Sequence, residues 1–398
     1  MISFPSSYLF CIRLPIKSSH LVIIFQFISW CCHKMENIPT LLLLMLLHFG
    51  FSNAKIGSHE VIDNPSPVSA MFAFGDMMIE TGNNNFLNSI AKSNFWPYGC
   101  DFNRGPTGRF TNGKTIVDLL GERFAMPYLP PYADPTTAGP RIMAGVNYAS
   151  AGAGILDETA RHWGDRFSLS QQVINFQNTL NQLRNTMSGR NITRYLEKSI
   201  AFMWFGTNDY INNYLMPLLY DSSFNYKPPE FANLLLTRYA QEILALYNVG
   251  LRKFFIVGLS PIGCIPNQRA TGQAPVGRCV DSVNQMLGSF NEGLRSMVVQ
   301  LNANHPAGIF VYFNAYGALG DILNNPASYG FTVIDRACCG LGQITCLPSS
   351  MPCPSRNQYL FWDAYQTTEA ANSILAQRAF TGPPADCYPI NFQQLALI

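Results

Sequence analysis

Residues 72–85 read FAFGDMMIETGNNN, and this stretch decides the fold. The apolar run from Ala70 to Phe74 predicts a strand that stops at Gly75-Asp76, where a polar, asparagine-rich loop begins. A strand that is buried on both faces of a parallel sheet has such a continuous apolar sequence. In α/β proteins the ligand site lies beyond the carboxyl ends of these strands. The stretch therefore predicts a parallel α/β fold with its site at Gly75-Asp76 and the loop that follows.

The same pattern recurs along the chain, with apolar runs separated by amphipathic segments. Further strands are predicted at 144–149, 199–205, 253–257 and 308–313. Helices are predicted at 115–124, 170–187, 230–248, 280–302 and 368–380, the last capped by Thr368. Repeating β-α units place helices on both faces of the sheet. We expect a three-layer α/β/α domain with a mainly parallel, five-stranded, flavodoxin-like sheet that no linker or repeat divides.

Two apolar runs near the start, Leu21–Cys32 and Leu41–Phe51, are shorter than the roughly 20 residues of a membrane span. The second follows Met35 and ends in small residues, Ser52 and Ala54, as a signal-peptidase site does. We interpret residues 1–34 as an N-terminal extension, 35–54 as a signal peptide and 55–398 as a single secreted domain without a transmembrane segment. The alternative is that residues 1–54 form one targeting or anchor segment.

The charge balance excludes one class of partner. The 26 basic and 24 acidic residues become 23 of each when residues 1–54 are removed with Arg13, Lys17, Lys34 and Glu36. A mature chain with no net charge has no general attraction for nucleic acids or anionic membranes. We therefore expect no nucleic-acid partner.

The cysteine pattern indicates disulfides rather than a metal site. Removing residues 1–54 leaves eight cysteines, at positions 100, 264, 279, 338, 339, 346, 353 and 387. An even count behind a signal peptide predicts disulfides. The cluster at 338–353 contains no CxxC pair and has no histidine nearby, so no metal is expected. Asn191 begins an Asn-Ile-Thr acceptor site for N-glycosylation.

Four short blocks, read in order, resemble the plant GDSL esterase/lipase family of the SGNH hydrolases. They are the Phe-Gly-Asp stretch at 74–76 with its asparagine-rich loop, GVNYAS at 145–150, GTNDY at 206–210 and FWDAY at 361–365. Together they span Ala70 to Asn372. The resemblance implies the SGNH-hydrolase fold, secretion to the apoplast or cell wall, hydrolysis of carboxylic esters without a cofactor, and a shallow site at the carboxyl ends of the strands.

The resemblance also assigns roles to particular positions, and two of them carry unexpected residues. The family places a nucleophilic serine where this chain has Met77, and a basic histidine where it has Gln366. Asp363 matches the aspartate that orients the histidine. The family's oxyanion hole consists of the backbone N–H at the nucleophile position, an asparagine that matches Asn208, and a glycine.

That glycine is either Gly152 or Gly154, and one sequence does not choose between them.

Both substitutions remove chemistry. The thioether of Met77 has no proton to lose and cannot attack a carbonyl, and the amide of Gln366 has no useful basicity near neutral pH. Asp363 can still accept a hydrogen bond from the Gln366 amide. We therefore expect a secreted protein whose ancestors hydrolysed esters and which now binds a small ester or acyl ligand, or a protein partner. The alternative is an active esterase or lipase that uses non-standard catalytic residues.

No replacement residues stand out. The mature chain has three histidines, and we expect His59 near the N-terminus, His162 at the surface and His305 in a connection. Hydroxyls at Thr81, Ser150 and Ser260 follow or lie near strand ends, but no histidine accompanies them.

Overall fold

The computed structural model describes residues 66–398, so the expected N-terminal extension and signal peptide lie outside the described residues. Five strands form the main sheet in the order β1-β2-β3-β4-β7. Their bounds are β1 Met71–Gly75, β2 Ile200–Trp204, β3 Lys253–Val257, β4 Ile309–Phe313 and β7 Cys387–Tyr388. The first four strands are parallel and β7 is antiparallel to β4. The predicted mainly parallel α/β fold is confirmed.

The four parallel strands end level with one another. Gly75 is opposite Trp204, Trp204 is opposite Val257, and Val257 is opposite Phe313. The loops that follow them therefore leave one edge of the sheet together. This arrangement places residues that are distant in sequence beside the Gly75-Asp76 turn.

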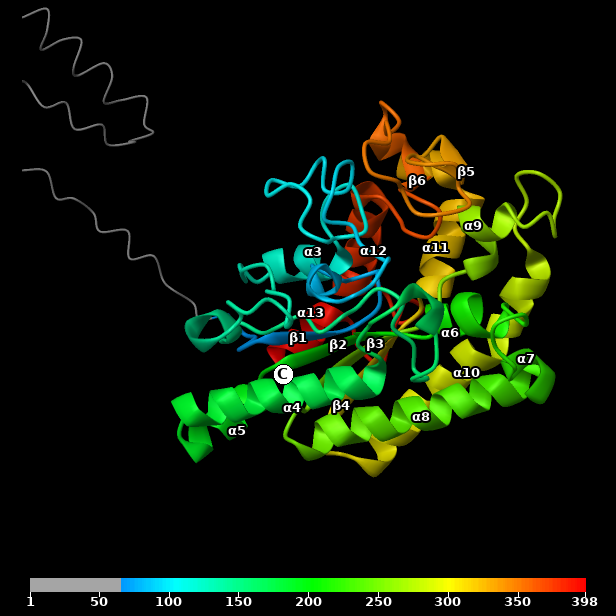
Figure 1. The fold of residues 1–398 in the computed structure, drawn as a ribbon. Coiled ribbons are helices and arrows are strands. Elements are labelled where there is room, and N and C mark those ends of the chain that lie inside the picture. Colours follow the sequence, from blue (N-terminus) through cyan, green and yellow to red (C-terminus); the bar gives the residue numbers. More distant parts are fainter. Residues whose placement is uncertain (1–65) are drawn as a thin grey trace, which may run out of the picture. The chain divides into compact units, whose positions relative to one another are not determined.

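Helices cover both faces of the sheet, as Figure 1 shows. One layer contains α4 Leu169–Thr186, α5 Gly189–Glu197, α8 Pro228–Asn248 and α10 Asp281–Asn304. The other contains α3 Ile116–Glu122, α11 Ala315–Asn324, α12 Glu369–Thr381 and α13 Phe392–Leu397. The predicted helices coincide with α3, α4, α8, α10 and α12, and Thr368 caps α12 by accepting a hydrogen bond from the Ala371 N–H.

The predicted strand at 144–149 is an irregular edge instead. Its backbone runs parallel to β1 and exchanges hydrogen bonds with it, but only one bridge forms, between Ala73 and Asn147. Gly145 interrupts the ladder because its φ is +115°, and a Cβ there would overlap the Met71 carbonyl. The fifth strand is the two-residue β7 on the opposite edge, which is too short to give a sequence signal.

The remaining elements are short and lie in the connections. A separate parallel pair consists of β5 Val333–Ala337 and β6 Tyr359–Phe361. The short helices are α6 Thr207–Asp209, α7 Ser222–Asn225, α9 Pro266–Arg269, a π-turn at Tyr210–Tyr214 and 3-10 turns at Asn83–Phe86, Gly139–Ile142, Arg161–Trp163, Ile262–Cys264, Pro326–Tyr329 and Arg356–Gln358.

Disulfides join Cys264 to Cys279, Cys338 to Cys353 and Cys339 to Cys346. Six of the eight expected cysteines are thus paired, but Cys100 and Cys387 are free thiols. Cys387 is buried in β7, where its thiol lies against the carbonyl oxygen of Ala379. Because these two cysteines have no sulfur partner, the even count overstated the number of disulfides.

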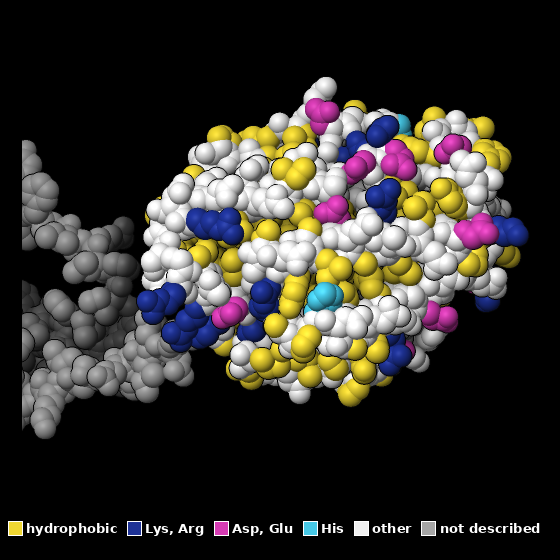
Figure 2. Space-filling model, turned by 90° about the horizontal axis from the view of Figure 1, so that it is seen from below, with side chains coloured by type: hydrophobic (Ala, Val, Ile, Leu, Met, Phe, Trp, Pro, Cys, Tyr) yellow, Lys and Arg dark blue, Asp and Glu magenta, His cyan; other side chains and the backbone are white. Residues whose placement is uncertain are grey.

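The outer face of the α4, α5 and α8 layer mixes surface types (Figure 2). Hydrophobic side chains are scattered between polar ones, and Lys and Arg side chains gather toward one end of the face. In residues 66–398 no helix is both long and apolar enough to cross a membrane.

Candidate functional site

The loops after β1 and β2 meet through one hydrogen-bonded pair. Asn208 follows β2, and its side-chain amide donates to Oδ2 of Asp76 at 3.3 Å and to the carbonyl oxygen of Ala153 at 2.9 Å. Asn208 and Asp76 are both fully buried. The first three sequence blocks therefore converge on this asparagine.

The turn after β1 carries the apolar side chain of Met77. Oδ1 of Asp76 accepts a hydrogen bond from the Met78 N–H at 2.9 Å, while the Met77 N–H donates none among the described residues. The Met77 side chain is only 3% exposed and packs in an apolar cluster with Tyr98, Phe110 and Trp362. Met77 therefore packs as a core residue.

Asp363 is fully buried and its carboxylate is satisfied by the protein itself. Oδ1 accepts hydrogen bonds from the backbone N–H groups of Tyr365 (2.9 Å) and Gln366 (2.8 Å), and Oδ2 accepts one from the Tyr98 hydroxyl at 2.6 Å. The expected bond from the Gln366 amide is thus made by its main chain. Burial raises the pKa of Asp363 to about 6, against the opposing effect of the Tyr98 bond.

Gln366 closes the turn that carries Asp363. Its carbonyl oxygen accepts a 2.7 Å hydrogen bond from the Trp362 N–H, and its side chain is 4% exposed. Within residues 66–398 the side-chain amide forms no hydrogen bond. Trp362 belongs to the apolar cluster that contains Met77. The fourth sequence block therefore lies beside the turn that follows β1.

The two candidate oxyanion glycines are required for different reasons. Gly152 has a φ of +85° in a turn closed by the Ala153 N–H, which donates to the Ser150 carbonyl at 2.9 Å. A Cβ on Gly154 would lie 2.5 Å from the Cβ of Thr159. Neither glycine N–H has a hydrogen-bond acceptor in the described chain.

Two buried carboxylates hold this loop, and sequence reasoning missed them. Asp209 accepts hydrogen bonds from the N–H groups of Ile155 (2.8 Å) and Leu156 (3.0 Å), and Glu80 accepts one from Ala151 at 2.6 Å. The only available signal was that both lie inside quoted stretches, Glu80 in residues 72–85 and Asp209 in GTNDY at 206–210.

The same carboxyls, with Asp76, titrate well above their ordinary range. Burial raises the pKa of Asp76 to about 7, of Glu80 to about 8 and of Asp209 to about 6.

The other candidate hydroxyls and histidines have structural partners. The Ser150 hydroxyl donates to Oδ1 of Asn84 at 2.6 Å, and that of Thr81 donates to the Leu129 carbonyl at 3.4 Å. His162 is exposed and shares a 2.9 Å hydrogen bond with the Tyr220 hydroxyl, as expected of a surface histidine. His305 packs on the ring of Tyr247. Ser260 is buried, and His59 lies outside the described residues.

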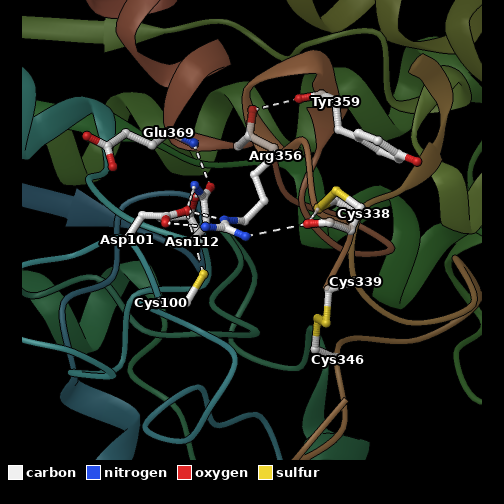
Figure 3. Close-up of a disulfide and its surroundings, with 12 residues drawn as sticks. Cys100, Asp101, Asn112, Cys338, Cys339, Cys346, Arg356, Tyr359 and Glu369 are labelled. Carbon is white, nitrogen blue, oxygen red and sulfur yellow. Dashed lines mark hydrogen bonds and ion pairs between the residues drawn. A yellow bond between two sulfur atoms is a disulfide. The ribbon is translucent and has the colours of Figure 1, made fainter. Parts of the chain in front are cut away.

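Figure 3 shows the disulfides of residues 338–353. Hydrogen bonds join this disulfide-bonded segment to the fourth block. Its Cys339 N–H donates to the Trp362 carbonyl at 2.7 Å, and its Cys346 N–H donates to the Tyr98 hydroxyl at 3.0 Å. Beside it, Arg356 forms a two-point ion pair with Asp101 at 2.6 and 2.8 Å, next to the free Cys100. The segment therefore fixes Tyr98, and through it Asp363.

The described residues offer no metal centre. No three His, Cys, Asp or Glu side chains in residues 66–398 are placed to hold an ion together. Asn191 lies exposed in α5, with the Thr193 hydroxyl bonded to the Gly189 carbonyl.

Comparison with known proteins gives one consistent family. A family model described as GDSL-like lipase/acylhydrolase matches residues 71–379. An Arabidopsis thaliana protein described as a GDSL esterase/lipase is 60% identical over 343 residues, which cover 85% of this chain and 92% of the relative. A second from the same plant is 49% identical over 348 residues (85% and 90%), and GDSL esterase/lipase 7 is 42% identical over 349 residues (86% and 95%).

Proposed function

The chain belongs to the GDSL-like lipase/acylhydrolase family, a family of ester hydrolases, and on that premise we propose that this member binds an ester or acyl ligand without hydrolysing it. One observation carries the proposal: Met77 occupies the nucleophile position and Gln366 the base position. The two substitutions remove both partners of a single proton transfer. That pattern fits abandoned chemistry better than one isolated change would.

The expected loss of rate is large. In a comparable Ser-His-Asp enzyme, removing the serine or the histidine costs about a millionfold in kcat, and removing both costs little more. What remains is roughly 10³ to 10⁴ over water, from the oxyanion hole and binding alone. Burial of Met77 in an apolar cluster supports the proposal further, because its side chain is packed as a core residue is.

Unpaired backbone donors support the binding of a carbonyl group. The N–H groups of Met77, Gly152 and Gly154 have no acceptor in the described chain, and Asn208 lies between the first and second blocks. We propose that the Met77 N–H and one of the two glycine N–H groups hold the ligand's carbonyl oxygen. Asn208, expected to be the third donor, has both amide hydrogens bonded to Asp76 and Ala153 and would have to release one of them to take part. Backbone donors fixed in this way bind an oxyanion or carbonyl without any nucleophile.

Secretion to the apoplast or cell wall is part of the proposal. Three disulfides support an oxidising destination, and the exposed Asn191 supports N-glycosylation on the way. Residues 35–54 would supply the signal peptide.

A second candidate is an active ester hydrolase that uses other residues. The favouring observation is the 60% identity to a protein described as an esterase/lipase. Against it, the hydroxyls of Ser150 and Thr81 already donate to protein acceptors, and His162 bonds to Tyr220.

One experiment separates the two candidates. The protein is purified from a secretory host, and its hydrolysis of short- and long-chain p-nitrophenyl esters is compared with that of the double variant Met77→Ser/Gln366→His. We expect the native protein to be slower by a factor on the order of 10³ or more. A fluorophosphonate probe, which labels activated serines, should leave the native protein unlabelled. Turnover comparable to the double variant, or labelling of the native protein, would establish the second candidate instead.

A further inference from the structure

An uncharged apolar patch lies on the connection between β5 and β6 (Figure 1) and on the segment that precedes Tyr98. It consists of large apolar side chains that are half exposed or more, Trp96, Leu341, Ile344, Leu347 and Met351. We call these five residues the apolar loop patch. We propose that the patch docks the protein on a lipid layer with zwitterionic headgroups. The inference does not rest on the proposed function.

Two disulfides gather the patch into one place. They start from adjacent cysteines and fold the chain into two short loops, 340–345 and 347–352, that begin side by side. Each loop carries two residues of the patch. The N–H of Ser349, in the second loop, donates to the Trp96 carbonyl at 3.1 Å, so Trp96 lies against that loop. The five side chains therefore belong to one region of the surface.

The patch side chains project outward from a fixed base. Cys339 and Cys346, which flank the first loop and are bonded to each other, are buried in the cluster that contains Trp362. Leu341 is 92% exposed and Met351 is 85% exposed, so both contact little of the protein. Exposed apolar side chains scattered singly are ordinary, but several in one place mark a surface that binds a protein or a membrane.

The absence of charge in the patch selects the kind of surface. Residues 93–100 and 337–355 contain no Asp, Glu, Lys or Arg. The charges that flank these two stretches have both signs and nearly cancel: Lys92, Asp101, Asp335, Arg336 and Arg356. Of these, Arg356 and Asp101 pair directly at 2.6 Å. Anionic lipid attracts clusters of basic residues, whereas a patch like this one matches a lipid surface without net charge.

A fluid lipid layer matches projecting apolar side chains better than a protein does. A protein partner would need a preformed pocket for each projecting side chain, because the cores of protein interfaces are packed as closely as protein interiors. Acyl chains instead close around whatever enters them, and the transfer of each apolar side chain out of water is favourable. Trp96 suits the boundary of such a layer, because an indole combines an apolar body with one N–H donor.

The docked loops share their support with the turn at Met77. The disulfide-bonded segment that carries four residues of the patch bonds to the Trp362 carbonyl and the Tyr98 hydroxyl, and both of these residues pack with Met77. Docking therefore places the Met77 cluster directly behind the loops that enter the lipid. Docking itself needs neither the nucleophile nor the base that the family uses, so this proposal and the proposed function stand or fall separately.

The first test is flotation of the full secreted protein with phosphatidylcholine vesicles. We expect the protein to float with them, and neither added phosphatidylserine nor about 1 M NaCl to change the bound fraction much. Leu341→Gln/Met351→Gln should lower the partition coefficient about tenfold or more. Ile174→Gln/Val299→Gln is the matched control, because it replaces two half-exposed apolar residues on α4 and α10, and it should float as the native protein does.

The second test locates the contact at Trp96. Phosphatidylcholine with brominated acyl chains quenches the fluorescence of tryptophans that enter the layer. Of the other tryptophans in residues 66–398, Trp204 and Trp362 are buried and Trp163 is partly exposed. We expect quenching in the native protein and its loss in Trp96→Phe, which keeps an aromatic ring at this position.

Several results overturn the proposal. They are no flotation, flotation that requires phosphatidylserine and disappears in salt, and flotation that Leu341→Gln/Met351→Gln leaves unchanged. A dimer in sedimentation that the same double variant dissociates also overturns it, because the patch is then an interface between two copies. Should that variant fail to fold, the quenching of Trp96 remains decisive. Met77→Ser/Gln366→His should float as the native protein does, whichever way the ester experiment turns out.

Discussion

The Tyr98 hydroxyl donates a 2.6 Å hydrogen bond to Oδ2 of Asp363, across 265 residues of sequence. It also accepts a 3.0 Å hydrogen bond from the Cys346 N–H. Tyr98 therefore joins the aspartate of the fourth block to the disulfide-bonded segment. Oδ1 of Asp363 accepts hydrogen bonds from two backbone N–H groups, those of Tyr365 and Gln366. The carboxylate therefore stabilises the turn at 363–366 even though no histidine occupies position 366.

Replacing this tyrosine should destabilise the protein measurably. Tyr98→Phe leaves Asp363 and the Cys346 N–H each short of a partner in a buried place, so we expect a loss of about 1–3 kcal/mol in the free energy of unfolding. Urea denaturation followed by fluorescence measures it. Tyr226→Phe, in an exposed loop, is the control and should change stability little. Equal stability of Tyr98→Phe and the native protein would show that the bond is not stabilising.

Stability should fall as the pH rises. The carboxyls of Asp76, Glu80, Asp209 and Asp363 have pKa values of about 6 to 8 in the fold, raised chiefly by burial. The unfolded chain releases these protons near pH 4, so between about pH 5 and about pH 8 these four groups bind more protons in the folded state than in the unfolded state. His162, whose pKa is lowered by burial, acts in the opposite direction but is one group against four. The free energy of unfolding must then decrease with pH across that interval.

Denaturation curves at several pH values check this, with Glu80→Gln as the informative variant. It removes one titrating group, so its stability should depend less steeply on pH than that of the native protein. A native profile that rises between about pH 5 and about pH 8 would contradict the raised pKa values.

Met77 should contribute to stability as a core residue does. Met77→Ala leaves a cavity in the cluster with Tyr98, Phe110 and Trp362, and we expect a loss of about 2 kcal/mol or more. Met78→Ala, at the neighbouring and partly exposed position, is the matched control and should cost less. Thermal unfolding of the two variants gives the comparison. If Met77→Ala proves the milder change, Met77 is not acting as packing.

Single repairs should not restore hydrolysis. Met77→Ser supplies a hydroxyl without a base, and Gln366→His supplies a base without a nucleophile, so neither should approach the double variant in p-nitrophenyl ester turnover. Groups that act as one unit have strongly non-additive effects on kcat. Substantial activity in Met77→Ser alone would reveal a base other than residue 366.

The sequence predicted the scaffold well where burial is continuous. The strand at 253–257 coincides with β3, and the other three parallel strands differ by one or two residues at their ends, because runs buried on both faces have a clear apolar signature. It misjudged 144–149, where the conformation of Gly145 breaks the ladder, and it missed β7, which has only two residues.

The site was predictable only in part, for a related reason. The family blocks singled out Met77, Asn208, Asp363 and Gln366, whose roles stay predictions, but the bond of Tyr98 to Asp363 depends on tertiary structure alone. No local pattern distinguishes Tyr98 from the other tyrosines of the chain. Likewise, the backbone N–H of Gln366, and not its side-chain amide, donates a hydrogen bond to Asp363. The residue type alone does not predict which of these two groups is the donor.

The sheet order β1-β2-β3-β4 follows the order of synthesis, so each parallel strand can add to a partner that has already emerged from the ribosome. The contacts around the fourth block have the opposite character. Tyr98 with Asp363, Asp101 with Arg356 and Asn112 with Glu369 all join residues more than 250 positions apart. Such long-range contacts carry a high loop-closure cost and form late in folding. The contacts around the fourth block can therefore close only when the last part of the chain has been made.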